Sequence, residues 1–370
     1  MEINRVIPIL VTFFLTSIVY AQFDEGGNVK RRYCFEKSIE KMGERFVSWD
    51  CGKSDRILDC NEKLESDPGS SLVVHRKSRT PYTGTCETCH NNGLKQRVVN
   101  FRDGKVHGID TTYYTSGCPQ VVREHIDGVE SGTWTYFNDS SGLVAWRTQF
   151  RDGEKHGKSI NYSHYMVGTD KMTVKIGQSE KEIRFGIYER DTIKIEHFKN
   201  GKLDGQKKEY YPGSKIRKEV SYKEGRLDGP YIYYDEEGNI LQELEYKNGK
   251  KHGEWKFYYD NGKLLRTENW SEGVKSGEFK TFFIQGFVQE LEVYNDKGQK
   301  HGWFETRFPD EKIKRRARYR RDQLIEEHVF DEYGNEIKTV GKPVEVDEDD
   351  EVPEAKSKGD RKWWQFWKKK

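Results

Sequence analysis

The sequence lacks the features on which most enzymes and thick-cored globular domains depend. Apolar residues make up only 34% of the 370-residue chain, and charged residues make up another 34%. We find no Ser-His-Asp arrangement, no P-loop, no GxGxxG after a strand pattern and no carboxylate pair at a meaningful spacing. Helical periodicity is missing over residues 82–335. These absences argue against an enzyme and against a helical fold, and we expect no cofactor.

Charge of one sign and long apolar segments are also scarce. The net charge is +2, which is too balanced for general nucleic-acid binding. The one apolar stretch, Val6 to Val19, follows Arg5 and ends before Ala21, which is the pattern of a signal peptide cleaved after Ala21. It is shorter than the ~20 residues that span a bilayer. We therefore predict a protein exported to the periplasm or cell envelope.

What the chain has instead is a glycine-centred unit that recurs about every 24 residues. In the clearest copies an aromatic residue leads into the turn glycine, and a second glycine follows four positions later, as in Tyr246-Lys-Asn-Gly249-Lys-Lys-His-Gly253. Such self-similarity indicates an array in which each unit buries apolar surface against its neighbours. A degenerate copy lies near Gly177, and the predicted repeat turn glycines are Gly104, Gly128, Gly153, Gly201, Gly225, Gly249, Gly273 and Gly298.

Each repeat contains two strand patterns and two turns. Trp255 and Phe257 alternate with polar neighbours, which is the period-2 pattern of a strand with one covered face. Asn261-Gly262 then predicts a hairpin turn, because both central residues of such a turn can adopt positive φ. Asp103-Gly104 and its equivalents return the chain to the next hairpin. Equivalents of the Asn261-Gly262 turn end at Gly93, Gly117, Gly142, Gly213, Gly238 and Gly286.

The predicted fold is all-β, an elongated array of about ten hairpin repeats of about 24 residues that form a twisted antiparallel sheet. That repeat length leaves no room for a crossover helix. We expect a signal peptide at 1–21, a cysteine-containing region at 22–80, the repeats at 81–340 and a disordered tail at 341–370.

The repeat resembles the MORN-repeat-variant family. The resemblance rests on the unit Tyr-Lys-Asn-Gly-Lys-x-x-Gly with its following strand, Asn-Gly turn and Lys-Leu strand, and it runs from about Tyr82 to Asn335. The family includes the bacterial YwqK-like antitoxins, and the signal peptide and tail resemble those of exported Bacteroidetes-type proteins. The resemblance implies a MORN-like binding or scaffolding role and no catalytic residue.

Cys86-Glu-Thr-Cys89-His90 is the sharpest local motif, since Cys-x-x-Cys-His is the attachment sequence of c-type haem. On a strand, however, Cys89 and His90 would face opposite sides, and a disulfide role fits an exported protein better. A Cys89–Cys118 bridge would cross three strand steps, roughly 14 Å, which exceeds the ~7 Å limit between Cα atoms. Bridges to the N-terminal cysteines or a vicinal Cys86–Cys89 bridge stay open; the candidates are Cys34, Cys51, Cys60, Cys86, Cys89 and Cys118.

Histidines recur just before the second glycine, at His107, His156, His252 and His301. Ser131, Asp204, Asp228 and Ser276 fill the same position in other repeats, so we expect a polar turn residue there and no metal site. The dense basic segment between Lys314 and Arg321 is either a solvated strand face or a surface for an anionic lipid or polysaccharide.

The tail joins an acidic run, Glu345–Glu351, to an aromatic and basic end. The four aromatic side chains of that end suit an interfacial membrane contact or a partner, namely Trp363, Trp364, Phe366 and Trp367. We predict an exported non-enzymatic scaffold that binds a protein or envelope-surface partner. The alternatives are a redox or haem protein using Cys86, Cys89 and His90, and an antitoxin or immunity factor.

Overall fold

The computed structural model describes the backbone of residues 18–23, 29–35, 57–176 and 179–341, and the side chains of 57–169 and 188–341. The predicted signal sequence before Ile18, Cys51, Gly177 and the tail after Gly341 lie outside the described residues. The chain divides into two compact units, Met1–Asn239 (unit 1) and Ile240–Lys370 (unit 2). Within the described residues, no helix is both long and apolar enough to cross a membrane.

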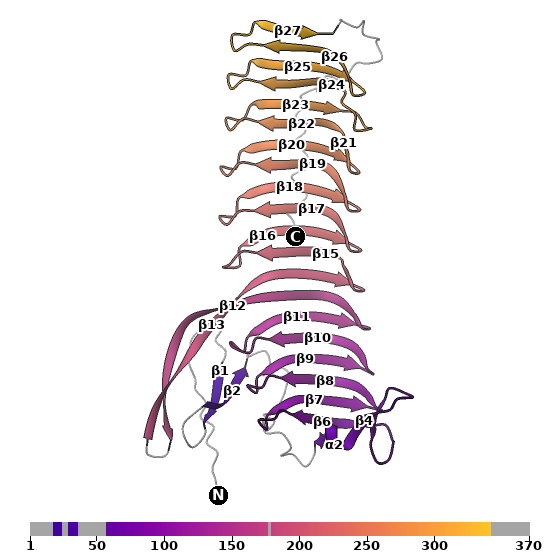
Figure 1. Cartoon of the computed structure of the whole chain (residues 1–370), viewed down its shortest axis with the longest axis vertical. Coiled ribbons are helices and arrows are strands. Elements are labelled where there is room, and N and C mark those ends of the chain that lie inside the picture. The colour runs from indigo at the N-terminus through magenta and orange to yellow at the C-terminus, as the bar shows by residue number, and fades with distance from the viewer. Residues whose placement is uncertain (1–17, 24–28, 36–56, 177–178, 342–370) are drawn as a thin grey trace, which may run out of the picture. The chain divides into compact units, whose positions relative to one another are not determined.

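Unit 1 is a ladder of antiparallel strands that begins with an N-terminal cap (Figure 1). The cap contains β3 (Leu58–Asp59), the one-turn helix α2 (Cys60–Lys63), β4 (Leu64–Ser66) and β5 (Val73–His75). β3 pairs in parallel with β6, and every later pairing in the unit is antiparallel. A separate strand pair, β1 (Ile18–Phe23) and β2 (Val29–Phe35), includes the predicted cleavage point after Ala21. The ladder strands are β6 (Gly84–Cys89), β7 (Lys95–Arg102), β8 (Lys105–Tyr113), β9 (Pro119–Ile126), β10 (Val129–Phe137), β11 (Val144–Arg151), β12 (Glu154–Ile176), β13 (Ser179–Lys199), β14 (Lys202–Leu203), β15 (Gly205–Tyr210), β16 (Ile216–Lys223) and β17 (Arg226–Tyr234).

Unit 2 repeats the same design with no break in its hairpin order. Its strands pair antiparallel, each with the next along the chain, so the all-β hairpin array predicted from the glycine spacing is confirmed. The strands are β18 (Ile240–Lys247), β19 (Lys250–Tyr258), β20 (Leu264–Ser271), β21 (Val274–Lys275), β22 (Gly277–Phe282), β23 (Val288–Tyr294), β24 (Gly302–Arg307), β25 (Ile313–Arg320), β26 (Gln323–Phe330) and β27 (Glu336–Val340).

The two turns of a repeat have different backbone geometry. At Asp103-Gly104 both central residues have positive φ, 51° and 78°, as in a type I′ turn. At Asn261-Gly262 only the glycine has positive φ, and Tyr259 N–H donates to the Lys263 carbonyl at 2.8 Å. The second turn is therefore a longer loop with a bulge at its glycine, and the partner register shifts beside it. The sequence located both turns but predicted the wrong type for this one.

The second glycine of each repeat occupies a bulge in the strand after the type I′ turn. Gly253 has a φ of 67°, and a Cβ there would lie 2.6 Å from the Glu245 carboxylate on the neighbouring strand. The register between β18 and β19 shifts just beside it, between Glu243 and Glu245. Only a glycine combines this backbone angle with such a close approach of the neighbouring side chain.

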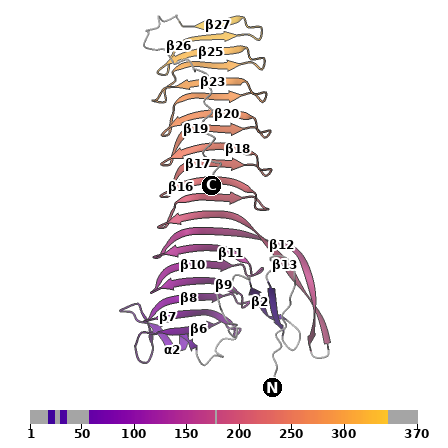
Figure 2. The ribbon, with the colours of Figure 1, turned by 180° about the vertical axis from the view of Figure 1, so that it is seen from behind.

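β12 and β13 correct the prediction of a degenerate repeat near Gly177. Only the base of β12 pairs with β11, over Glu154–Asn161, whereas β12 and β13 pair with each other as far as Ile176 and Ser179. The outer part is therefore a two-stranded ribbon, and it stands away from the rungs of unit 1 in both views (Figure 1, Figure 2). A segment long enough for a second repeat extends one hairpin instead.

Candidate functional site

The type I′ turns are linked from one repeat to the next by backbone hydrogen bonds. The N–H of Gly128 donates to the Val106 carbonyl at 2.7 Å, and that of Gly225 donates to the Leu203 carbonyl at 2.7 Å. Seven of the eight predicted turn glycines follow a residue that also has positive φ: Gly104, Gly128, Gly153, Gly201, Gly225, Gly249 and Gly273. These turns form one edge of the ladder within each unit.

Gly298 differs from the other predicted turn glycines. Its φ is 78°, but Lys297 before it does not have positive φ, and the Gly298 N–H donates to the Asn295 carbonyl at 2.9 Å. This turn therefore has the longer geometry of the Asn261-Gly262 class. The spacing of 25 residues from Gly273 to Gly298, in place of 24, is the sequence signal of the extra residue.

The polar residue before the second glycine receives a hydrogen bond from the following type I′ turn. The Asp127 N–H donates to His107 Nδ1 at 3.3 Å, and the Glu224 N–H donates to the Asp204 carboxylate at 3.1 Å. A histidine, an aspartate or a threonine can accept this bond, which explains the interchange seen in the sequence. Within the described residues, no group of three or more histidine, cysteine or acidic side chains could hold a metal ion.

One face of unit 2 carries a continuous row of aromatic rings, which we call the aromatic face. Neighbouring ring centroids lie 5.2–5.9 Å apart for most pairs and 4.9 Å apart for the last pair. Several of these rings are almost fully buried although the row is built on a single sheet, including Phe279 at 3% exposure. The row consists of Tyr246, Trp255, Trp270, Phe279, Tyr294, Phe304 and Tyr319.

Three lysines from consecutive repeats cover this aromatic row. The Lys251 ammonium lies 4.3 Å from the Trp255 ring and 4.1 Å from the Trp270 ring. Lys275 and Lys300 stand in the same way over the next two ring pairs, at 4.4–5.4 Å. Each cation gains two aromatic contacts while its methylene stem covers apolar surface. The lysine ladder was not predicted from the sequence, although its spacing of 24 and 25 residues is visible there.

Unit 1 replaces aromatic residues at this position with ionic groups. Asp110, which corresponds to Trp134 of the next repeat, is 1% exposed and lies between Arg97 at 2.7 Å and Arg123 at 3.2 Å. His125 beside it packs against Trp134 with ring centroids 5.4 Å apart. Burial lowers the pKa of His125. A charged cluster thus takes the place of the aromatic row in the first repeats.

The cysteine motif is structural. Cys86 is fully buried and forms a disulfide with Cys60, with Cα atoms 5.2 Å apart. Cys89 and Cys118 are also disulfide-bonded. The vicinal Cys86–Cys89 bridge is therefore wrong, and the haem hypothesis is wrong as well, because thioether attachment needs both sulfurs of the motif. The side chains of Cys34 and Cys51 lie outside the described residues.

His90 has the same role as tyrosines in later repeats. Its Nε2 lies 3.0 Å from the Tyr113 carbonyl oxygen, 23 residues ahead. Tyr114 donates its hydroxyl proton to the Phe137 carbonyl at 3.0 Å, again 23 residues ahead. His90 therefore connects one repeat to the next and is not placed as a haem ligand.

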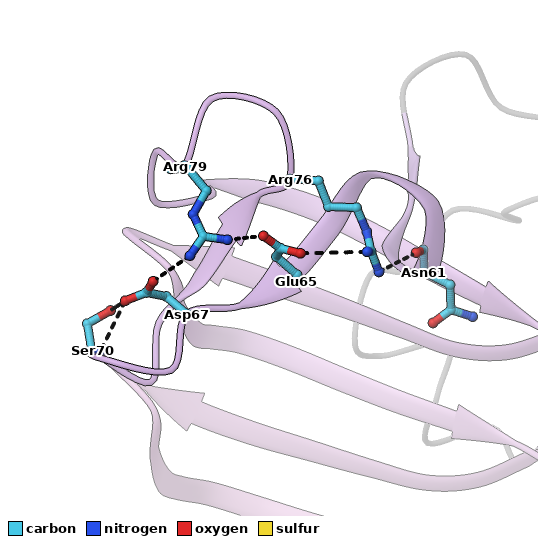
Figure 3. A network of polar contacts seen from close by, with 6 residues as sticks. All are labelled: Asn61, Glu65, Asp67, Ser70, Arg76 and Arg79. Atoms are coloured by element: carbon cyan, nitrogen blue, oxygen red, sulfur yellow. Dashed lines mark hydrogen bonds and ion pairs between the residues drawn. The ribbon is translucent and has the colours of Figure 1, made fainter.

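The N-terminal cap is held by a network of polar side chains (Figure 3). Arg79 contacts the carboxylates of Glu65 and, at 2.8 Å, Asp67. Arg76 lies 3.6 Å from the other oxygen of Glu65 and donates to the Asn61 carbonyl at 3.0 Å. Both arginines are thus paired within the cap, so this loop is a brace for the first rung of the ladder and offers little free charge.

The opposite face of unit 2 carries a row of polar side chains that crosses the strands, which we call the polar row. Cross-strand partners share a face, and the pairings run without interruption from β18 to β27. Next to the row, Glu254 pairs with Lys256 at 3.3 Å, and both side chains are more than a third exposed. The members of the row are Glu243, Lys256, Thr267, Lys280, Leu291, Glu305, Arg316, His328 and Thr339.

The basic segment at 314–321 is divided between the two faces. Arg315 lies on the aromatic-face side and pairs with Glu327 at 2.7 Å. Arg315 and then Lys338 hold the pKa of Glu327 below its usual value. Arg316 and Arg318 point to the polar-row side, opposite Glu305 and Trp303 on β24. The tail aromatics Trp363, Trp364, Phe366 and Trp367 lie outside the described residues.

Comparisons with known proteins support the repeat assignment. The family model described as MORN repeat variant matches residues 203–224, 227–248 and 251–272. A search of curated proteins finds no match. The match does not extend to the YwqK-like antitoxins or to a bacterial group, which stay predictions of the resemblance.

Two solved structures show a distant likeness. One is a Tc holotoxin pore of Photorhabdus luminescens with the mutation TccC3-D651A, and the other is the crystal structure of TcdB2-TccC3-TEV. Each is 10% identical over 88% of this chain and 17% of that chain, with TM-scores of 0.14 and 0.13. This chain therefore spans less than a fifth of either protein, and TM-scores this low carry no argument about fold or function. Residues 203–272 thus contain three consecutive repeats that are similar to the MORN repeat variant.

Proposed function

We propose that this protein is an exported, non-enzymatic scaffold whose polar row in unit 2 binds a protein partner at the cell envelope. The observation that carries the proposal is the division of labour between the two faces of unit 2. The aromatic face closes on itself through its rings and the covering lysines. The side chains that stabilise the unit are therefore separate from those that meet solvent on the opposite face.

The polar row suits a binding role because its charges are held at regular intervals on a rigid sheet. Glu254 with Lys256 and Glu278 with Lys280 repeat one charge pair at the same position of successive repeats. Exposed ion pairs contribute little to folding, so their exchange for contacts with a partner costs little stability. Complementary charge on a partner would supply orientation and association rate.

The test is affinity purification of the intact exported protein from envelope fractions, followed by mass spectrometry. The double variant Lys256→Glu/Lys280→Glu should lose the captured partner at least tenfold. Lys250→Glu/Lys263→Glu changes the charge equally at exposed turn positions and should retain it. Equal capture by both double variants would show that the polar row is not the binding surface.

We further propose that the tail brings the scaffold to an anionic membrane surface. Four aromatic and five basic residues lie within 361–370, and each basic residue near an anionic surface contributes roughly 1 kcal/mol. Deletion of residues 361–370 should reduce co-sedimentation with vesicles containing anionic phospholipid at low salt and leave the repeat fold unchanged. Equal co-sedimentation of the full-length and truncated proteins would assign the tail another role.

A further inference from the structure

Three arginines of β25 form a line along one face of the last hairpins, and we call Arg316, Arg318 and Arg320 the arginine strip. Alternate residues of a strand share a face, and the pairings of Arg316 with Glu305 and of Arg318 with Trp303 place the first two on the polar-row side. Lys314 stands at the start of the strip, beside the register shift between β24 and β25. It is exposed, and its ammonium is 5.7 Å from the Phe308 ring.

Arg316 is the least compensated charge of the strip. Its guanidinium carbon lies 3.9 Å from the centroid of the Trp303 ring, which gives it a flat stacking surface but no counter-charge. The nearest candidate, Glu305, pairs with Arg307 at 2.6 Å instead. Arg316 Nε is buried without a hydrogen-bond partner in the part of the chain that the structure describes. The Arg318 contact to Glu326 is long, at 3.9 Å.

The described chain ends next to this strip. Val340 pairs with Glu327, and Gly341 lies so close to β26 that a Cβ on it would overlap the Ile325 carbonyl. Glu326, the next residue of β26, pairs with Arg318. Gly341 is thus two strand steps from the strip, roughly 10 Å. The four residue steps from Gly341 to Glu345 can span up to about 14 Å.

The segment that begins at Glu345 has complementary charge and length. Glu345–Glu351 contains six carboxylates in seven residues. Extended, seven residues reach about 23 Å, and the six strand steps from Lys314 to Arg320 cover about 20 Å. A short tether gives such a segment an effective concentration in the millimolar range. Arginine is also the cation that pairs best with carboxylates in two-pronged geometry.

From this juxtaposition we propose that the acidic run Glu345–Glu351 binds the arginine strip of its own chain. The run supplies the carboxylates that Arg316 lacks and covers the exposed end of unit 2. An anionic surface or partner that uses the strip must first displace it, so the run tunes access to this face. The contact is electrostatic and weakens as salt shortens the Debye length from about 10 Å at 0.1 M to about 3 Å at 1 M.

Zero-length carbodiimide cross-linking of the full-length protein tests the contact, because it joins a lysine amine to a carboxylate only when the two touch. Peptide mapping should find Lys314 joined to a carboxylate of Glu345–Glu351 within one chain at 50 mM salt. The yield should fall about tenfold in Arg316→Gln/Arg318→Gln, which keeps side-chain length and removes two charges. The matched control Lys202→Gln/Arg226→Gln removes two charges from exposed turn positions of unit 1 and should retain the cross-link.

Cleavage by a protease specific for acidic residues gives a second measurement that does not depend on Lys314. At one fixed salt concentration, the run should be cut about fivefold faster in Arg316→Gln/Arg318→Gln than in the control variant. Equal cross-linking and equal cleavage in the two double variants would overturn the proposal. A cross-link found only between two chains would also overturn it, because the run would then bind a second copy.

Discussion

Replacement of Gly104 with alanine should destabilise the protein more than the same replacement of Gly249. Both glycines follow a residue with positive φ, and their own φ values are 78° and 81°. An L-residue in this region costs roughly 1–2 kcal/mol at either position. A Cβ on Gly249 meets nothing within 4 Å, so backbone strain is its whole cost.

At Gly104 a steric cost is added to the strain. The new Cβ would lie 2.8 Å from the Leu72 Cβ and 2.9 Å from the Val73 carbonyl oxygen. The cap must therefore move away from the turn, and the Val73 N–H loses its 2.8 Å bond to the Gly104 carbonyl. Overpacking contributes about 1–3 kcal/mol and the hydrogen bond about 1 kcal/mol, so Gly104→Ala should cost roughly 3–5 kcal/mol in total.

Hydrogen exchange read by mass spectrometry resolves the two units in one urea titration. Peptides from 82–137 report on Gly104→Ala, and peptides from 246–294 report on Gly249→Ala. Gly69→Ala is the control, since its φ is not positive and its nearest neighbour, the Asp67 carboxylate, would lie 3.7 Å away. Losses at Gly104 and Gly249 that agree within about 0.5 kcal/mol would refute the argument that the cap packs on the first turn.

Three further outcomes are expected. Lys251→Met should cost about 1–2 kcal/mol in unit 2, since two cation–π contacts of about 0.5–1 kcal/mol each are lost; Lys250→Met, at the exposed neighbouring position, should change stability by less than about 0.5 kcal/mol in the same denaturation assay. The hydrogen bond to Glu336 raises the pKa of His328 above its ordinary value of 6.5, so its stabilising contribution is complete below that pH and is lost as the pH rises through the raised value. Amide protection factors in β27 should accordingly fall on the alkaline side of pH 6.5, and no such fall should occur in His328→Gln. Non-reducing peptide mapping should recover Cys60 joined to Cys86, and the purified protein should show no Soret band; a Cys86–Cys89 peptide would contradict the structure.

The sequence by itself determined the hairpin array, because its signals are local. Asp103-Gly104 specifies a turn through the backbone freedom of two adjacent residues, and Trp255 with Phe257 specifies a one-sided strand through a period of two. Neither signal depends on distant contacts. Repetition of both at one spacing then fixed the order of the rungs within each unit.

Signals that depend on length alone were ambiguous in the sequence. A 48-residue interval from Gly153 to Gly201 equals two repeats, yet the chain forms a single long hairpin there, because backbone pairing between β12 and β13 competes with pairing to the ladder. The Asn261-Gly262 turn likewise identified a hairpin but not its loop length. Register decides that length, and register is set by the paired strands.

Only the tertiary structure decided which side chains meet. The motif of Cys86 and Cys89 reads as haem attachment until Cys60, 26 residues earlier, is seen bonded to Cys86. Lys251 reads as a solvated turn residue until strand pairing brings Trp255 and Trp270 beneath it. Both outcomes depend on distances across strands, and a single sequence carries no record of such distances beyond its own turns.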